Sequence, residues 1–168
     1  MHDLSLRYGG PMDGHKSHQS GRDVDMTYYQ RGCREQCLGH RVAPSELDAD
    51  RQWQLLRHWL QRDVVEFIFV DYSLQRPLYE AALASGATAA ELARWFQYPR
   101  GSAFPTGIIR HTPNHANHVH VRFRCSDGEL TCKGTATRDV SHGTEGGLVL
   151  LELVEDESEN ALRELIAE

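Results

Sequence analysis

The chain has 168 residues, of which 40% are hydrophobic, and this length suits one hydrophobic core rather than two, so we expect one domain. Its formal net charge of −6 argues against nucleic acid or an anionic membrane as the partner, since either normally binds a basic surface. The sequence contains no run of about 18 apolar residues and therefore predicts no membrane-spanning helix.

The first informative segment is a glycine-marked stretch over residues 14–26. Residues 23–26 alternate polar and apolar side chains, which predicts a short strand with Asp23 and Asp25 on one face. His18 and Asp25 offer a neutral nitrogen and an anionic oxygen, which are both accepted ligands of zinc. Taken alone, the segment favours a simpler interpretation, a polar surface loop whose aspartates accept hydrogen bonds in turns.

The middle of the chain begins with a predicted helix and a predicted strand. Asp48 or Asp50 is a good N-cap for a helix over residues 51–62, where apolar side chains recur at helical spacing. We expect its Trp53 to lie in the core. Residues 64–70 are mostly β-branched and aromatic, which predicts a central, mostly buried strand.

Two further helices and a long loop follow. The first helix covers about residues 73–85 and ends at a glycine, with Pro77 either in its first turn or bending it. Thr88-Ala89-Ala90-Glu91 is a capping box that opens the second helix. Residues 99–112 contain several glycines and prolines and predict a long loop, which can line a substrate groove.

Three histidines within six residues, His115, His118 and His120, stand just before an alternating apolar run. If this run is a strand, His118 and His120 share one face, while Val119 and Val121 share the other and enter the core. Imidazole is the commonest protein ligand for zinc, and two on one strand face can reach the same small volume. The histidine face therefore predicts a site that still needs ligands from elsewhere.

The four cysteines form two close pairs, Cys33/Cys37 and Cys125/Cys132. An even count suits disulfides in an exported protein, whereas zinc sites with four cysteines usually have shorter C-x-x-C spacing. The Asp-Gly turn between Cys125 and Cys132 is explained by a hairpin-like loop that a disulfide closes. The pairing of Cys33 with Cys37 stays open.

The pattern at the C-terminal end is less specific. Residues 148–154 form a continuous apolar run that fits a strand or a short buried helix, and periodicity does not decide between them. Residues 155–168 are acidic, with apolar side chains on one helical face, and predict a surface helix or a frayed tail.

The two histidine segments resemble the motifs of a known group of enzymes. Residues 17–25 resemble the S-H-x-x-G-x-x-x-D motif of the LAS metallopeptidases, and His118-Val119-His120 resembles their H-x-H motif. More narrowly, residues 14–19, residues 115–122 and the adjoining Cys125 and Cys132 resemble the penicillin-insensitive murein endopeptidases of bacterial periplasms. The order of the motifs along the chain also matches this family.

The resemblance implies a zinc endopeptidase that hydrolyses amide bonds in peptidoglycan cross-links, of the D-alanyl to meso-diaminopimelate type. It implies an α+β fold, a small single domain with a central antiparallel sheet flanked by helices and the metal site on the sheet face. We expect this domain to span residues 1–154, with residues 155–168 as an acidic helix or tail. A periplasmic or extracellular location is also implied, although the N-terminal residues include no apolar signal region.

Carried over by position, the resemblance assigns one zinc ion to His18, Asp25 and His120. Three protein ligands leave one position for water, whose pKa zinc can lower to about 7. Asp23 is expected to support the site or a turn rather than to bind the metal. The ligand set suits zinc and also accepts cobalt or nickel.

Proton transfer is expected from imidazoles that do not bind the metal. His118 matches the family's candidate catalytic residue and is the first choice for the base. His115 matches another site histidine, which can act as the base or, if it is protonated, stabilise the oxyanion. His15 matches a site-adjacent histidine with the weakest claim. No glutamate, the base of many zinc peptidases, adjoins the histidine motif.

Two other functions fit the same residues. The first is a peptidoglycan D,D-carboxypeptidase or D,D-dipeptidase, a neighbour within the same class of enzyme. The second is a non-catalytic cell-wall binding module that keeps the metal site. His115 and His118 favour the hydrolase, because a metal used only for folding or binding does not need spare imidazoles beside it.

Overall fold

The structure is a computed structural model that describes residues 21–34 and 40–125, together with Leu4, Gly10, Asp13, His18 and Cys37. All of these belong to the first of two units into which the chain divides, Met1–Lys133 and Gly134–Glu168. The apolar run at residues 148–154, the acidic tail and the predicted boundary between them lie outside the described residues.

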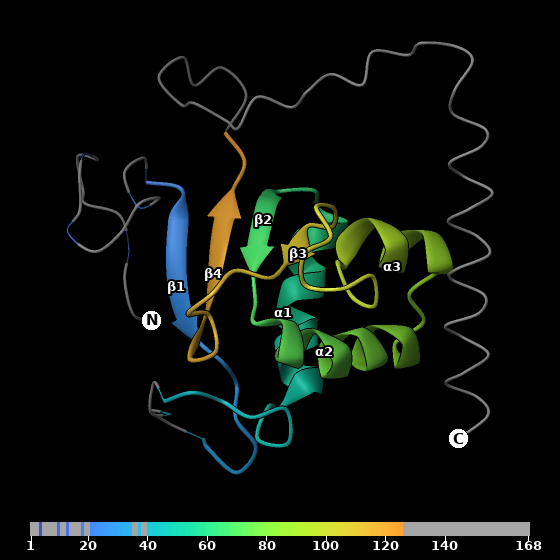
Figure 1. Cartoon of the computed structure of the whole chain (residues 1–168), viewed down its shortest axis with the longest axis horizontal. Helices are drawn as coiled ribbons and strands as arrows, with labels where there is room; N and C mark the ends of the chain where they lie inside the picture. The colour runs from blue at the N-terminus through green and yellow to red at the C-terminus, as the bar shows by residue number, and fades with distance from the viewer. Residues whose placement is uncertain are drawn as a thin grey trace. The chain divides into compact units, whose positions relative to one another are not determined.

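Four strands form one sheet in the order β1-β4-β2-β3. Strands β1 (Asp23–Thr27) and β2 (Val65–Phe69) both pair antiparallel with β4 (His118–Phe123), the strand of the histidine motif, which therefore lies inside the sheet. The short β3 (Ile109–Arg110) pairs parallel with β2 and forms an edge (Figure 1). It was not predicted, because two residues inside a stretch rich in glycine and proline carry no local strand pattern.

Strand β4 alternates as its sequence predicts. Val119 and Val121 are 0% exposed and belong to the hydrophobic core, while His118 and Arg122 on the other face are partly exposed. One face of the sheet is therefore a core face and the other can carry a site. The predicted α+β fold with a central antiparallel sheet is confirmed by β1, β4 and β2, whereas the edge strand β3 pairs parallel.

The three predicted helices are present, as α1 (Ala49–Gln61), α2 (Tyr72–Ala84) and α3 (Ala89–Trp95). Asp48 caps α1, and the capping box of Thr88 and Glu91 opens α3, as predicted. Pro77 lies inside α2, beyond its first turn. None of the helices in the described part of the chain is long and apolar enough to cross a bilayer.

The helices gather around the β2–β3 side of the sheet, and β1 forms the other edge (Figure 1). Trp53 of α1 lies in the core as predicted, with its ring centroid 5.7 Å from that of Trp95 and 5.6 Å from that of Phe96. The same core contains Val119 and Val121. The packing of the helices therefore fixes the position of β4 from its core face.

Each of the two cysteine pairs that are close in sequence contains at least one cysteine that forms a disulfide. Cys33 and Cys37 are bonded to each other, with their Cα atoms 5.8 Å apart. Cys125 is also in a disulfide. Its predicted partner, Cys132, lies outside the described residues, so that pairing stays a prediction.

We predict that Val121→Ala destabilises the protein by about 2 kcal/mol, because it opens a cavity beneath β4 that the core closes only in part. Urea denaturation followed by circular dichroism measures this. Val64→Ala is the matched control, since Val64 is 39% exposed and its truncation should change the free energy of unfolding by less than about 0.5 kcal/mol. Equal effects from the two variants would contradict the assignment of Val121 to the core.

Candidate metal centre

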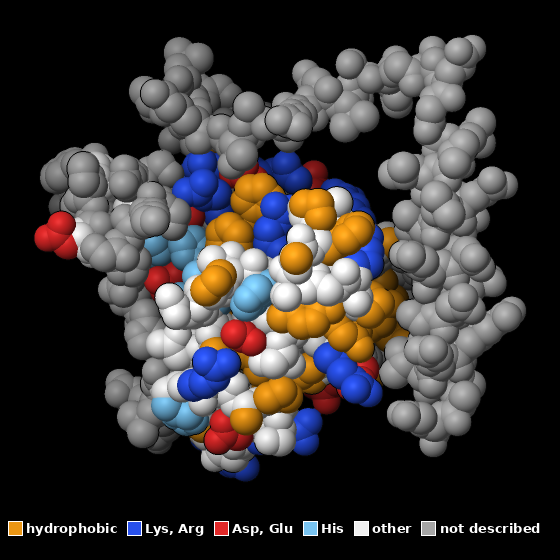
Figure 2. All heavy atoms as spheres, in the orientation of Figure 1, with side chains coloured by type: hydrophobic (Ala, Val, Ile, Leu, Met, Phe, Trp, Pro, Cys, Tyr) orange, Lys and Arg blue, Asp and Glu red, His pale blue; other side chains and the backbone are white. Residues whose placement is uncertain are grey.

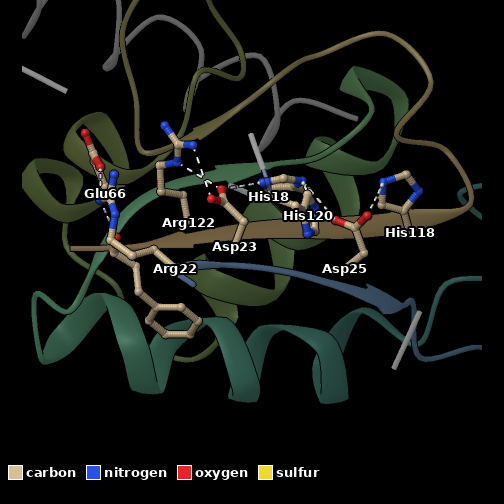
Figure 3. Close-up of polar contacts among 9 residues, drawn as sticks. His18, Arg22, Asp23, Asp25, Glu66, His118, His120 and Arg122 are labelled. Carbon is tan, nitrogen blue, oxygen red and sulfur yellow. Dashed lines mark hydrogen bonds and ion pairs between the residues drawn. The ribbon is translucent and has the colours of Figure 1, made fainter. Parts of the chain in front are cut away.

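The site lies where β1 pairs with β4, on the face turned away from the core. In this pairing Asp25 lies opposite His120, and Asp23 lies opposite Arg122. Directly opposed residues in an antiparallel pair have Cβ atoms about 4.5–5.5 Å apart, so their side chains can touch. The two carboxylates of β1 therefore reach the imidazole and the guanidinium of β4 (Figure 3).

Three potential metal ligands converge in this site. Oδ1 of Asp25 lies 2.9 Å from Nδ1 of His120 and 3.2 Å from Nε2 of His18, and the two nitrogens are 3.3 Å apart. A tetrahedral zinc ion with bonds of 2.0–2.1 Å holds its ligand atoms about 3.3 Å from one another. All three side chains are buried, and together they form a group that can hold a metal ion.

The hydrogen bond from His120 to Asp23 decides which nitrogen of His120 faces the cluster. Its Nε2 lies 2.9 Å from Oδ1 of Asp23, and because a carboxylate only accepts, Nε2 carries the proton. Nδ1 then presents its lone pair toward an anionic oxygen of Asp25, an arrangement that needs a cation or a second proton between them. The chemistry of the donors therefore fits a bound cation.

The pKa values of these groups agree with a site built for positive charge. Burial acts to lower the pKa of His120, but its hydrogen bonds to Asp23 and Asp25 and their charges raise it overall. Burial acts to raise the pKa of Asp25, but the hydrogen bond and charge of His120 and the nearby histidines hold it below its ordinary value. Asp25 is therefore a carboxylate at neutral pH.

Asp23 supports His120 from the side opposite the cluster. Arg122 donates to both oxygens of Asp23, from Nε at 2.9 Å and from a terminal nitrogen at 3.2 Å. Burial acts to raise the pKa of Asp23, but the bonds from His120 and Arg122 lower it, so it too is ionised. A carboxylate on the far nitrogen of a metal-binding histidine fixes its tautomer and orientation. This geometry agrees with the supporting role that the sequence suggests for Asp23.

The two other histidines of the motif lie beside the cluster. Nε2 of His118 is 3.8 Å from Oδ2 of Asp25, and its Nδ1 is 2.8 Å from the side-chain oxygen of Asn117. The ring of His115 lies 4.7 Å from that of His118, and its Nδ1 donates to the carbonyl of Pro113 at 2.9 Å. With Nδ1 as the donor in both rings, each Nε2 is left with the lone pair that a base needs.

Burial lowers the pKa of His115, and its hydrogen bond to the Pro113 carbonyl does not offset this. His115 is therefore a neutral imidazole at neutral pH. Of the two roles that the sequence leaves open for it, a neutral ring suits proton transfer better than the stabilisation of an oxyanion by a positive charge.

Two residues outside the motifs hold the His115 segment in place and were not found from the sequence. The buried hydroxyl of Tyr28 donates to the carbonyl of His115 at 2.8 Å. The backbone N–H of Asp71, the N-cap of α2, points to the same carbonyl at 3.3 Å. The only signal for Asp71 was its position directly after a buried strand, and Tyr28 has no distinctive spacing.

An open pocket of about 270 Å³ adjoins the histidine motif and is lined by Arg41, Asn114, Ala116 and Asn117. Because Asn117 also contacts His118, the pocket opens beside the site. Histidine side chains reach the molecular surface on the face shown in Figure 2. The side chain of His118 is 19% exposed, so the described residues do not fully enclose the site.

The predicted site residues come from two segments far apart in the chain, and the structure brings His18, Asp25, His118 and His120 together (Figure 3). The ring of His115 lies beside that of His118. His15 lies outside the described residues. Glu66, which has no place in the motifs, pairs with Arg22 at 2.9 Å.

Comparison with known proteins points the same way. The profile of a family described as penicillin-insensitive murein endopeptidase matches residues 1–161. A protein of that name from Klebsiella pneumoniae subsp. pneumoniae is 28% identical over 149 residues, which cover 80% of this chain and 48% of that protein. One from Salmonella heidelberg is 28% identical over 146 residues, covering 78% and 47%. The chain thus spans about half the length of these relatives.

We predict that Asp23→Asn weakens metal binding by roughly 10- to 100-fold, because an amide no longer holds the N–H of His120 as a carboxylate does. Competition with a chromogenic chelator measures the affinity. Asp25→Ala, which removes one of the three donors, should lower metal content further. Asp50→Asn, at an exposed position in α1, is the control, and an Asp23 variant that binds metal as tightly as this control would contradict the supporting role.

Proposed function

The chain belongs to the penicillin-insensitive murein endopeptidase family, and on that premise we propose that it is a zinc-dependent murein endopeptidase. Its proposed reaction is the hydrolysis of amide bonds in the peptide cross-links of peptidoglycan, of the D-alanyl to meso-diaminopimelate type. The observation that carries this proposal is the convergence of three buried donors, from His18, Asp25 and His120, with two further imidazoles beside them.

We assign one zinc ion to His18, Asp25 and His120. Two neutral nitrogens and one carboxylate oxygen match the composition of catalytic zinc sites, which keep a further position open. When bound, zinc supplies Lewis-acid chemistry, since it acidifies a water molecule and polarises a carbonyl group. Asp23 keeps the Nδ1 lone pair of His120 directed at the donor cluster through its hydrogen bond to Nε2.

His118 and His115 are the proposed proton-transfer groups. Amide hydrolysis requires a base that takes a proton from the attacking water and an acid that returns one to the leaving amine. His118 is the proposed base, because its Nε2 carries a lone pair and lies 3.8 Å from the carboxylate of Asp25. His115, neutral and 4.7 Å from His118 between ring centroids, is positioned to share the transfer.

Peptidoglycan peptides as the substrate, and a periplasmic or extracellular location, belong to the same proposal. The name of the relatives refers to murein, which lies outside the cytoplasmic membrane. The disulfides at Cys33–Cys37 and at Cys125 support such a location, because disulfides persist in oxidising compartments and are rare in the cytosol.

We predict that the zinc-loaded protein converts purified cross-linked muropeptide dimers to monomers and stops when a chelator removes the metal. Mass spectrometry resolves the products and identifies the bond that is cut. His120→Ala, which lacks a proposed zinc ligand, is the inactive control. Release of terminal D-alanine would favour a D,D-carboxypeptidase instead, and metal binding without any product would favour a non-catalytic binding module.

We predict that His118→Ala keeps its zinc and loses turnover by about 10²- to 10⁴-fold, the usual contribution of a general base. Metal content and steady-state kinetics on the same preparation separate the two effects. His58→Ala is the control, since this histidine lies on an exposed position of α1. Turnover near the wild-type level would remove His118 as the base.

A further inference from the structure

One row of opposed residues crosses all four strands on the face of the candidate metal centre. Asp25 of β1 lies opposite His120 of β4, His120 opposite Phe69 of β2, and Phe69 opposite Arg110 of β3. Opposed residues project from the same face of a sheet, so Arg110 shares the face of the metal donors. Two strand spacings, roughly 10 Å, separate its backbone from that of His120.

Two phenylalanines cover the sheet between His120 and Arg110. The ring of Phe69 lies 5.3 Å from that of His120, and the ring of Phe67 lies 5.9 Å from that of Phe69. The guanidinium carbon of Arg110 then lies 4.2 Å from the centre of the Phe67 ring. Phe67, Phe69 and Arg110 are all partly exposed, and we call the two phenylalanines the aromatic strip. The strip leads from the metal donors to the positive charge of Arg110.

Arg110 differs from other arginines near the site in its ion pairing. Arg122 pairs with Asp23, and Arg22 pairs with Glu66. In the part of the chain that the structure describes, no aspartate or glutamate forms an ion pair with Arg110. Its Nε donates to the carbonyl of Gly107 at 2.8 Å, which orients the side chain without neutralising it.

Burial lowers the pKa of Arg110, as expected for a cation that has lost part of its water shell. A guanidinium nevertheless stays charged at any physiological pH. Its planar donors match the two oxygens of a carboxylate. A partly dehydrated, oriented guanidinium above an aromatic ring is therefore ready to bind an anionic group at low cost in reorganisation.

We propose that Arg110 binds a carboxylate group of the peptide substrate, which lies across Phe67 and Phe69 with its scissile bond at the metal donors. This inference rests on the proposed function, because it takes the bound molecule to be the peptide that is cleaved. About three residues of extended peptide span roughly 10 Å. The substrate class is therefore an acidic peptide with a free carboxylate roughly 10 Å from the scissile bond.

The test compares two muropeptide dimers, one with free carboxylates and one in which they are amidated. The wild-type protein should cleave the free form with a kcat/KM at least about tenfold higher, since a charged hydrogen-bonded pair is worth that much or more. Arg110→Gln should remove this preference by slowing only the free form, and Arg110→Lys should retain part of it. Arg76→Gln, at a 58% exposed arginine in α2 that pairs with Glu80, should keep the full preference.

Binding of the same two peptides to the zinc-loaded His118→Ala protein, which keeps the metal donors but lacks the proposed base, gives by calorimetry a readout that does not depend on turnover. Zinc content and the melting temperature show whether Arg110→Gln is folded. If it is not, Arg110→Lys decides: because lysine lacks the bidentate fork, a reduced preference supports the carboxylate site and an undiminished one overturns it.

The outcomes separate this inference from the proposed function. Cleavage with no preference for free carboxylates, or a preference that survives in both Arg110 variants, overturns the carboxylate site and leaves the endopeptidase intact. A preference in binding that Arg110→Gln abolishes, without cleavage of either dimer, keeps the carboxylate site and overturns the endopeptidase. If neither dimer binds or is cleaved, both proposals are wrong.

Discussion

Antiparallel pairing of β1 with β4 sets Asp25 opposite His120 and Asp23 opposite Arg122. Side chains alternate along a strand, so a slip of one residue between the two strands would turn the carboxylates away from their partners. Burial of Val119 and Val121 against the helices prevents such a slip, because it would expose them to water. The hydrophobic core on one face therefore holds the donors in place on the other.

The buried carboxylates of Asp23 and Asp25 also need positive charges close to them. Two carboxylates lie buried side by side, and buried charges are stable only when they are paired and hydrogen-bonded. Arg122 neutralises Asp23, while the imidazoles of His18, His118 and His120 lie around Asp25. A cation bound between these donors would balance the charge of Asp25, so the proposed metal ion should contribute to folding as well as to the proposed activity.

Residues outside β1 and β4 complete the wider site, and they come from separate segments of the chain. The carbonyl of His115 is held by Tyr28 and Asp71, so the proposed proton-transfer group is anchored to the core and to the start of α2. Arg110 is contributed by the two-residue β3 at the edge of the sheet. The proposed chemistry and the proposed peptide binding therefore depend on one continuous sheet face, which keeps the metal donors and the aromatic strip in fixed relation.

Local patterns in the sequence were sufficient for the capping box of Thr88 and Glu91 and for the alternation of β4, because each depends on neighbours a few residues apart. The grouping of His18 and Asp25 with His120 followed from the family resemblance, because the local pattern of their segment alone indicates a polar loop. The order of the strands, the contact of Asp23 with His120 and the position of Arg110 came only from the tertiary structure. These features join residues tens of positions apart, and which strands pair is decided by how the whole core packs rather than by any local preference.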